Sequence, residues 1–187
     1  MKLKVLQALT LAIVLASCGK KDNTIPADTI DITENFQPNT IQLGHHAVKE
    51  SSVAEIEKLV GEQSNDTLYV TNFFATWCGP CMREIPHFKQ YKEMMKDQPV
   101  KFQFVSLDPK EDWATEVSDF AVKNQLEKDI FLVDGRNITP EFYSKNFDQW
   151  DGSGIPFTLF RKGNQKSEYF GMMTGNELKS QINALMK

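Results

Sequence analysis

The stretch FFATWCGPCMREIPHF, residues 73–88, places Cys78 and Cys81 two residues apart behind an aromatic run. Residues 67–75, TLYVTNFFA, are β-branched and aromatic and carry no charge, as in a strand that is buried on both faces. From Gly79 to Met94 or Met95 the apolar residues recur at helical spacing. A strand that leads directly into a helix places Cys78 at the helix N-terminus, where free backbone N–H groups and the helix dipole stabilise a thiolate.

The two cysteines admit several chemical roles. Cys81 lies one helical turn beyond Cys78, within reach of a mixed disulfide formed there, so the spacing favours thiol–disulfide exchange. A zinc site needs two more ligands, and His45, His46 and His87 form no ligand pattern with the pair. A purely structural disulfide would close a very small loop and contribute little stability. A chaperone for copper or haem that uses the two thiols and a histidine remains an alternative.

The rest of the chain alternates predicted strands and helices. The expected strands are an edge strand at 41–43, the strand at 67–75, further strands at 100–108 and 130–134, and a hairpin over 155–171 that turns at 162–164. The expected helices are 52–62, 79–95, 111–126, 139–147 and 174–187. This order predicts an α/β fold with a largely parallel sheet, helices on both faces and an antiparallel hairpin at one edge.

The first 18 residues have the pattern of an export signal. Lys2 and Lys4 precede an apolar run at 5–16, which is too short to span a bilayer as a helix. The following LASC, residues 15–18, resembles the lipobox of bacterial lipoproteins, in which the cysteine is lipidated. We therefore expect a signal peptide at 1–17, a lipidated tether at 18–40 attached through Cys18, and a folded domain at 41–187. The alternative is an ordinary secretory signal that happens to contain a cysteine.

Composition narrows the choice of partners. The 187-residue chain has a formal net charge of −4, and its Lys and Arg residues are scattered. Without a basic stripe, nucleic acid is not expected as a partner. The length suits one domain with a short appendage, which we expect to be a monomer without a metal or cofactor.

Three features together resemble the thioredoxin superfamily over residues 40–187. They are WCGPC after a buried strand, the helix proline Pro86 five residues after the second cysteine, and GIPFTLFRKGNQ at 154–165. The resemblance implies a thioredoxin-like fold in which the Ile155–Pro156 bond is cis and lies beside the cysteines. It also implies an apolar rim for docking an extended substrate, formed by Trp77, Pro80, Ile155 and Pro156.

Other features resemble a membrane-tethered branch of that superfamily. The 48 positions from Asp108 to Pro156 leave room for an inserted helix–strand–helix before the cis-proline hairpin. With the lipoprotein start and CMREIP at 81–86, this resembles the ResA/TlpA group of thiol–disulfide reductases. In that group a glutamate matching Glu84 takes part in proton handling and partner selection. Asn72 stands where cytosolic thioredoxins carry an aspartate that accepts the Cys81 proton, so Glu84 or water must do so here.

These inferences combine into one functional hypothesis. We expect an extracytoplasmic, lipid-anchored reductase in which Cys78 attacks disulfides of exported proteins, Cys81 resolves the mixed disulfide and Glu84 assists the proton transfer. Gly79 and Pro80 between the cysteines resemble the reducing members of the superfamily. By resemblance, a membrane thiol carrier supplies the electrons and apocytochrome c is a possible client. A disulfide oxidase or isomerase, a peroxidase-like thiol enzyme, and a non-enzymatic metal or scaffold module of the same fold remain as alternatives.

Overall fold

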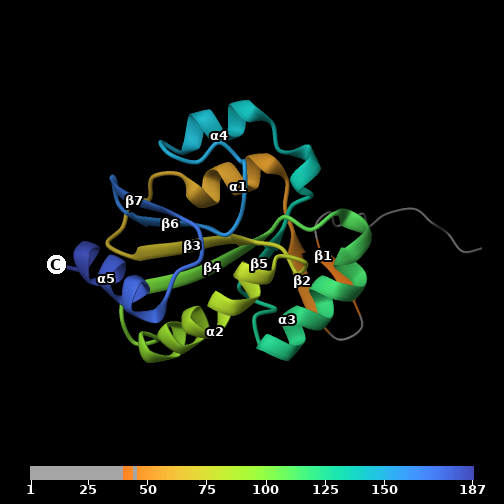
Figure 1. Cartoon of the computed structure of the whole chain (residues 1–187), viewed down its shortest axis with the longest axis horizontal. Coiled ribbons are helices and arrows are strands. Elements are labelled where there is room, and N and C mark those ends of the chain that lie inside the picture. The colour runs from red at the N-terminus through yellow and green to blue at the C-terminus, as the bar shows by residue number, and fades with distance from the viewer. Residues whose placement is uncertain (1–39, 44–45) are drawn as a thin grey trace, which may run out of the picture. The chain divides into compact units, whose positions relative to one another are not determined.

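The computed structural model describes residues 40–43 and 46–187 (Figure 1). The signal peptide predicted at 1–17, the lipidation site Cys18 and nearly all of the tether predicted at 18–40 lie outside these residues. The described residues fall within the domain predicted at 41–187, apart from Thr40, at which the first strand begins.

The strands of the described chain form one mixed seven-stranded sheet in the order β1-β2-β5-β4-β3-β6-β7. Their bounds are β1 Thr40–Leu43, β2 His46–Glu50, β3 Leu68–Phe74, β4 Val100–Ser106, β5 Ile130–Leu132, β6 Phe157–Lys162 and β7 Gln165–Phe170. The central strand β3 pairs in parallel with β4 and antiparallel with β6. Antiparallel strands, β1 and β7, lie at both edges, whereas the sequence predicted an antiparallel hairpin at one edge.

Helices cover both faces of this sheet, as the sequence predicted (Figure 1). Their bounds are α1 Val53–Val60, α2 Gly79–Met94, α3 Ser118–Asn124, α4 Pro140–Asn146 and α5 Gly175–Leu185. Helices α2, α3 and α5 lie on one face, and α1 and α4 lie on the other. A capping box at Thr174 and Glu177 starts α5, and a second one at Ser52 and Glu55 starts α1.

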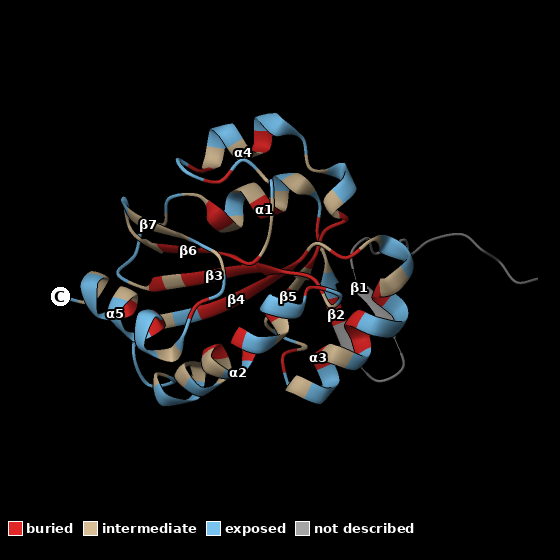
Figure 2. Cartoon of the chain, in the orientation of Figure 1, coloured by how far each residue is buried: buried red, intermediate tan, exposed pale blue. Residues whose placement is uncertain are grey.

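The two faces of β3 belong to two separate hydrophobic clusters. Val70 and Phe74 pack toward α2, where Phe88 is fully buried. Phe73 points to the opposite face and packs against Phe157 at 6.0 Å between ring centroids. Strand β3 is therefore buried on both sides (Figure 2), which is why its sequence is an uncharged, mostly apolar run and not an alternating one.

The predicted insertion is present between β4 and β6. It consists of α3, β5 and α4, and β5 adds to the sheet between β2 and β4. No helix in residues 40–43 and 46–187 is both long enough and apolar enough to cross a membrane.

Two segments differ from the sequence prediction. Strand β2, His46–Glu50, was not predicted, because its five residues include charged side chains and form no apolar run; pairing with β1 and β5 creates it. The single helix expected at 111–126 is instead a 3₁₀ turn at Lys110–Asp112, a π-helical turn at Trp113–Val117 and then α3. The buried Trp113 donates its indole N–H to the Asp108 carbonyl at 2.9 Å, and this bond ties the wider turn to the end of β4.

Candidate active site

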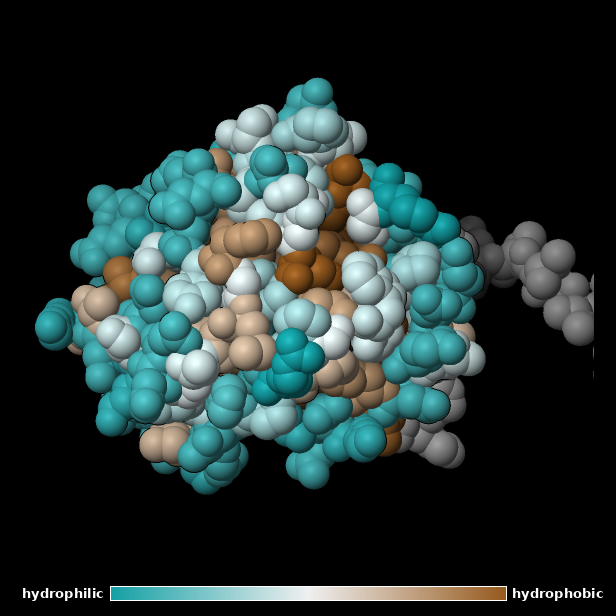
Figure 3. Space-filling view, in the orientation of Figure 1, coloured by the Kyte–Doolittle hydropathy of each residue, from teal (hydrophilic) through white to brown (hydrophobic). Residues whose placement is uncertain are grey.

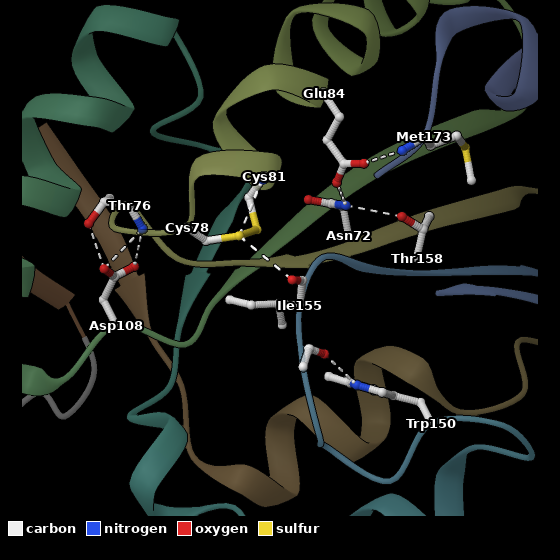
Figure 4. Close-up of a disulfide and its surroundings, with 11 residues drawn as sticks. Asn72, Thr76, Cys78, Cys81, Glu84, Asp108, Trp150, Ile155, Thr158 and Met173 are labelled. Carbon is white, nitrogen blue, oxygen red and sulfur yellow. Dashed lines mark hydrogen bonds between the residues drawn. A yellow bond between two sulfur atoms is a disulfide. The ribbon is translucent and has the colours of Figure 1, made fainter. Parts of the chain in front are cut away.

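The cysteine pair lies at the junction of β3 and α2, as predicted. Cys78 is the N-cap residue of α2 and forms a disulfide with Cys81, with an S–S distance of 2.01 Å (Figure 4). The backbone N–H of Cys81 donates to Cys78 Sγ at 3.2 Å. Cys78 retains 5% exposure, whereas Cys81 has none. A partner disulfide can therefore reach Cys78 first, and the helix N-terminus that holds its sulfur favours the thiolate.

The loop before β6 lies against the Cys78 sulfur. The Ile155–Pro156 bond is cis, as the resemblance implied, and the Ile155 carbonyl oxygen lies 3.8 Å from Cys78 Sγ. Trp150 supports this loop from beneath, because its indole N–H donates to the Gly154 carbonyl at 2.8 Å. Its ring also stacks on Phe157, with centroids 4.2 Å apart and planes 12° from parallel. The loop is thus held by the aromatic cluster on the α4 face of the sheet.

A buried carboxylate holds the turn that leads to the cysteines. Asp108 follows β4 and accepts hydrogen bonds from the Thr76 backbone N–H at 3.0 and 3.1 Å and from the Thr76 hydroxyl at 2.6 Å. The Ser106 hydroxyl donates to the same carboxylate at 2.7 Å. Thr76 lies two residues before Cys78, so these bonds hold the turn that leads to Cys78. Asp108 was not predicted as a site residue; its one sequence signal was its position at the end of a strand next to β3.

Glu84 lies inside the protein and not on its surface. It has no solvent exposure, and its Oε1 accepts a 2.8 Å hydrogen bond from the side-chain amide of Asn72. Its Oε2 accepts a 2.7 Å hydrogen bond from the backbone N–H of Met173, in the loop before α5. Burial raises the pKa of Glu84 to about 7, against the lowering effect of the bonds from Met173 and Asn72. A carboxyl group with this pKa can both take and release a proton at neutral pH.

Glu84 and Cys81 share the buried face of α2, one turn apart, as their spacing predicted. The contact from Met173 could not be predicted, because a backbone N–H carries no residue-specific signal. The predicted assignments of Cys78, Cys81 and Glu84 as catalytic residues are thus compatible with one compact cluster at the start of α2 (Figure 4).

The predicted docking residues differ in their exposure. Trp77 is 67% exposed and Pro80 is exposed, whereas Ile155 is half-buried and Pro156 is buried. Phe170, at the end of β7, is also 58% exposed, although it was not predicted. In the view of Figure 3, residues of high hydropathy lie near the middle of the face shown, among paler and hydrophilic ones. Exposed apolar residues that lie close together are typical of a surface that contacts other proteins.

Trp77 lines two grooves. One has a volume of about 480 Å³ and is also lined by Tyr143 of the inserted helix α4 and by Ile155. The other, of about 430 Å³, has Met82 and Phe120 in its lining, with acidic side chains on α3 and the turn before it. Both grooves reach the residue that precedes Cys78.

Within the described residues, no group of three or more His, Cys, Asp or Glu side chains is placed to hold a metal ion. Of the three histidines, His45 lies outside the described residues, and the ring of His87 lies beside Gly175 at the start of α5.

Comparisons with known proteins agree with this geometry. Residues 47–135 match the family model named Thioredoxin. Thioredoxin-2 of Saccharomyces cerevisiae is 37% identical over 79 residues, which cover 41% of this chain and 67% of the yeast protein. Sporulation thiol-disulfide oxidoreductase A of Bacillus subtilis is 27% identical over 110 residues, which cover 59% of this chain and 63% of that protein, less than two thirds of its length.

A solved structure supports the fold over a larger part of the chain. The thiol:disulfide interchange protein of the thioredoxin family from Chlorobium tepidum TLS superposes with a TM-score of 0.56 at 15% identity. The superposition covers 80% of this chain and 94% of the Chlorobium protein, so it includes elements beyond residue 135. On the family match, the yeast relative and the position of the cysteine pair, this chain belongs to the thioredoxin family, with Cys78 and Cys81 as its thiol–disulfide pair.

Proposed function

We propose that this protein reduces disulfide bonds of other proteins outside the cytoplasm. The observation that carries the proposal is the unequal exposure of the two cysteines: Cys78 retains 5% exposure at the N-terminus of α2, while Cys81, one turn further along the helix, has none. This asymmetry suits a pair in which one sulfur attacks a client and the other resolves the product.

The reaction conserves electrons and protons. In the reduced protein the Cys78 thiolate attacks one sulfur of the client disulfide, and the other client sulfur leaves as a thiolate. Cys81 then loses its proton and attacks the Cys78 sulfur, which releases the second client thiolate and forms the Cys78–Cys81 disulfide. Two electrons pass to the client, whose two thiolates take up two protons. A donor dithiol restores the protein by the same exchange in reverse.

Glu84 is suited to receive the proton that Cys81 must lose. Its carboxylate is buried one helical turn away, and its pKa of about 7 leaves about half of the molecules ionised at neutral pH. Asn72 cannot keep a proton on its amide, so the carboxylate that it contacts is the nearby base. A base with a pKa near the working pH is the most effective one for such a transfer.

Client docking follows from the surface around Cys78. The exposed Trp77 and the groove between it and Tyr143 can receive apolar side chains next to the client cysteine. Ile155 adds an apolar side chain to the same groove, and its carbonyl lies beside the Cys78 sulfur. We assign the docking rim to Trp77, Pro80, Ile155 and Pro156, as the resemblance implied.

The proposed location rests on the N-terminal sequence. The export signal at 1–17 and the lipobox-like LASC support a domain outside the cytoplasm that is tethered through a lipid on Cys18. On the ResA/TlpA resemblance, a membrane thiol carrier supplies electrons, and the clients are exported proteins, apocytochrome c among them. Labelling with radioactive palmitate tests the anchor: the intact chain should incorporate the label and Cys18→Ser should not.

A trapping experiment tests the reductase function. The Cys81→Ala variant should accumulate mixed disulfides with exported proteins through Cys78, since nothing resolves them. The matched Cys78→Ala variant should accumulate far fewer, because the buried Cys81 cannot be reached. If neither variant traps a protein, the scaffold alternative is favoured. Peroxide turnover that survives in Cys81→Ala would instead indicate a peroxidase.

The direction of electron flow needs its own measurement. Rapid acid quenching of cells followed by alkylation gives the redox state of Cys78 and Cys81 in vivo. A reductase with an electron supply should be mostly reduced. A standing disulfide would contradict the proposal and favour the oxidase alternative.

A further inference from the structure

Asn72 has one side-chain atom that the site described so far does not use. The residue is fully buried on β3, and its amide nitrogen donates to Glu84 Oε1 at 2.8 Å and to Thr158 Oγ1 at 3.0 Å. Its Oδ1 has no hydrogen-bond partner among the described residues. A buried acceptor without a partner is rare in folded proteins and calls for a specific explanation.

The neighbours of Asn72 determine which way this oxygen faces. An ionised Glu84 can only accept hydrogen bonds, and one of its oxygens is already occupied by the Met173 N–H. The amide nitrogen of Asn72 accordingly donates to Glu84 Oε1 and to Thr158 Oγ1, which turns Oδ1 to the other side. In Figure 4 that side faces Cys81. This direction agrees with the helix geometry, because Cys81 and Glu84 are one turn apart on the same buried face of α2.

We propose that Asn72 Oδ1 is the hydrogen-bond acceptor for the Cys81 thiol in the reduced protein. When two electrons and two protons from a donor dithiol open the Cys78–Cys81 disulfide, the Cys81 sulfur gains a hydrogen and can donate it to Oδ1. The inference rests on the proposed function in one respect, namely that the pair cycles between disulfide and dithiol.

This contact gives Asn72 a role in the redox equilibrium that differs from the role of an aspartate, because an aspartate could also take the Cys81 proton. In the disulfide form Oδ1 stays without a partner, and in the dithiol form it gains one, so the amide favours the reduced protein. The amide oxygen cannot retain the proton when Cys81 attacks. Under the proposed function that proton leaves to the Glu84 carboxylate, which lies one helical turn from Cys81 on α2. Asn72 therefore shifts the redox equilibrium toward the dithiol, and Glu84 takes the proton.

The redox equilibrium tests the first half of this assignment. The intact protein is equilibrated with mixtures of reduced and oxidised glutathione, and the dithiol fraction is counted by alkylation and mass spectrometry. Asn72→Leu should shift the equilibrium about fivefold toward the disulfide, the effect of one net hydrogen bond. The matched control is Thr158→Val, which removes the other partner of the same amide but leaves Glu84 to orient it; its shift should stay below about twofold.

The S–H stretching band tests the contact itself. It is recorded by infrared spectroscopy in a Cys78→Ser background, where Cys81 is reduced. Adding Asn72→Leu should move the Cys81 band to higher frequency, and adding Thr158→Val should not. Adding Glu84→Gln should also move the Cys81 band to higher frequency, although residue 72 is still asparagine in that variant. In that variant the Met173 N–H holds the oxygen of the new amide, so the new amide nitrogen faces residue 72. The Asn72 amide must then turn and present its own nitrogen to Cys81.

A reciprocal exchange completes the test. In the double variant Asn72→Asp/Glu84→Gln the two positions remain hydrogen-bonded, but residue 84 is now the donor and residue 72 the acceptor. The second carboxylate oxygen of residue 72 then faces Cys81. The low-frequency band should return. The proposal would be overturned if the Cys81 S–H band stays in place in both Asn72→Leu and Glu84→Gln. It would also be overturned if the thiol–disulfide equilibrium of Asn72→Leu lies within twofold of that of the intact protein. These measurements need no client, so a failure of the trapping experiment would reject the reductase function without affecting this result.

Discussion

The side-chain amide of Asn72 donates a 2.8 Å hydrogen bond to Glu84, and this bond joins the central strand to the helix that carries both cysteines. Both residues are fully buried, and the Met173 N–H occupies the second carboxylate oxygen at 2.7 Å. A carboxyl group is therefore kept in the core close to the cysteine pair, in an environment where its proton is exchangeable near neutral pH.

The buried Glu84 should make stability depend on pH. Its pKa rises from 4.5 to about 7 on folding, so its favourable contribution is complete below pH 4.5 and is lost as the pH rises through 7. The expected loss is about 3 kcal/mol, at 1.36 kcal/mol per pKa unit. Urea unfolding of the oxidised protein, whose disulfide-bonded cysteines do not titrate, should show this decline. Glu84→Gln should abolish it, and the exposed control Glu62→Gln should retain it.

The same carboxyl group should control the step in which Cys81 resolves a mixed disulfide. If ionised Glu84 accepts the Cys81 proton, as proposed, the rate constant should rise with pH through about 7 in the intact protein. Glu84→Gln should lower the rate constant by roughly 10²-fold and remove that inflection, since one general base is lost. Stopped-flow release of a chromophoric thiol from Cys78 gives the profile. Profiles that superimpose for the intact protein and Glu84→Gln would exclude the proposed role.

Asp108 should be required for the position of Cys78. Asp108→Asn replaces an oxygen that accepts hydrogen bonds by a donor, which leaves either the Thr76 or the Ser106 groups without their acceptor. We expect a loss of about 2 kcal/mol in the free energy of unfolding. The attack rate of Cys78 should fall as well, because Thr76 is no longer held. The exposed Asp97→Asn is the matched control, and an equal effect in both variants would argue against a specific anchor.

Trp77 should contribute to client binding and not to stability. Trp77→Ala should raise KM for a protein disulfide about tenfold, as expected for an exposed aromatic contact, with little change in kcat. Unfolding free energy should change by less than about 0.5 kcal/mol, as for other surface substitutions. Met94, which is 65% exposed at the end of α2, provides the control Met94→Ala. If KM rises equally in both variants, the groove beside Trp77 is not the docking site.

The sequence by itself was sufficient for the fold class and for the cysteine pair. The uncharged run at 67–75, the N-cap position of Cys78 and the capping box at Thr174 are local signals, and each is read within a few residues. The resemblance then supplied the insertion and the cis bond before Pro156. What local patterns missed were segments such as β2, whose conformation depends on pairing with strands elsewhere in the chain.

The tertiary structure alone decided how the site is completed. Glu84 and Met173, which are joined by a hydrogen bond, lie 89 positions apart in the sequence, and the hydrogen-bonded Asn72 and Thr158 lie 86 positions apart. Asp108 and Thr76 are hydrogen-bonded over a sequence separation of 32 positions. No periodicity or spacing predicts such contacts, because they exist only once α2 has packed on the sheet and the loops have closed around it. Burial then raises the pKa of Glu84, so the chemistry next to the cysteines depends on the packing of the whole domain.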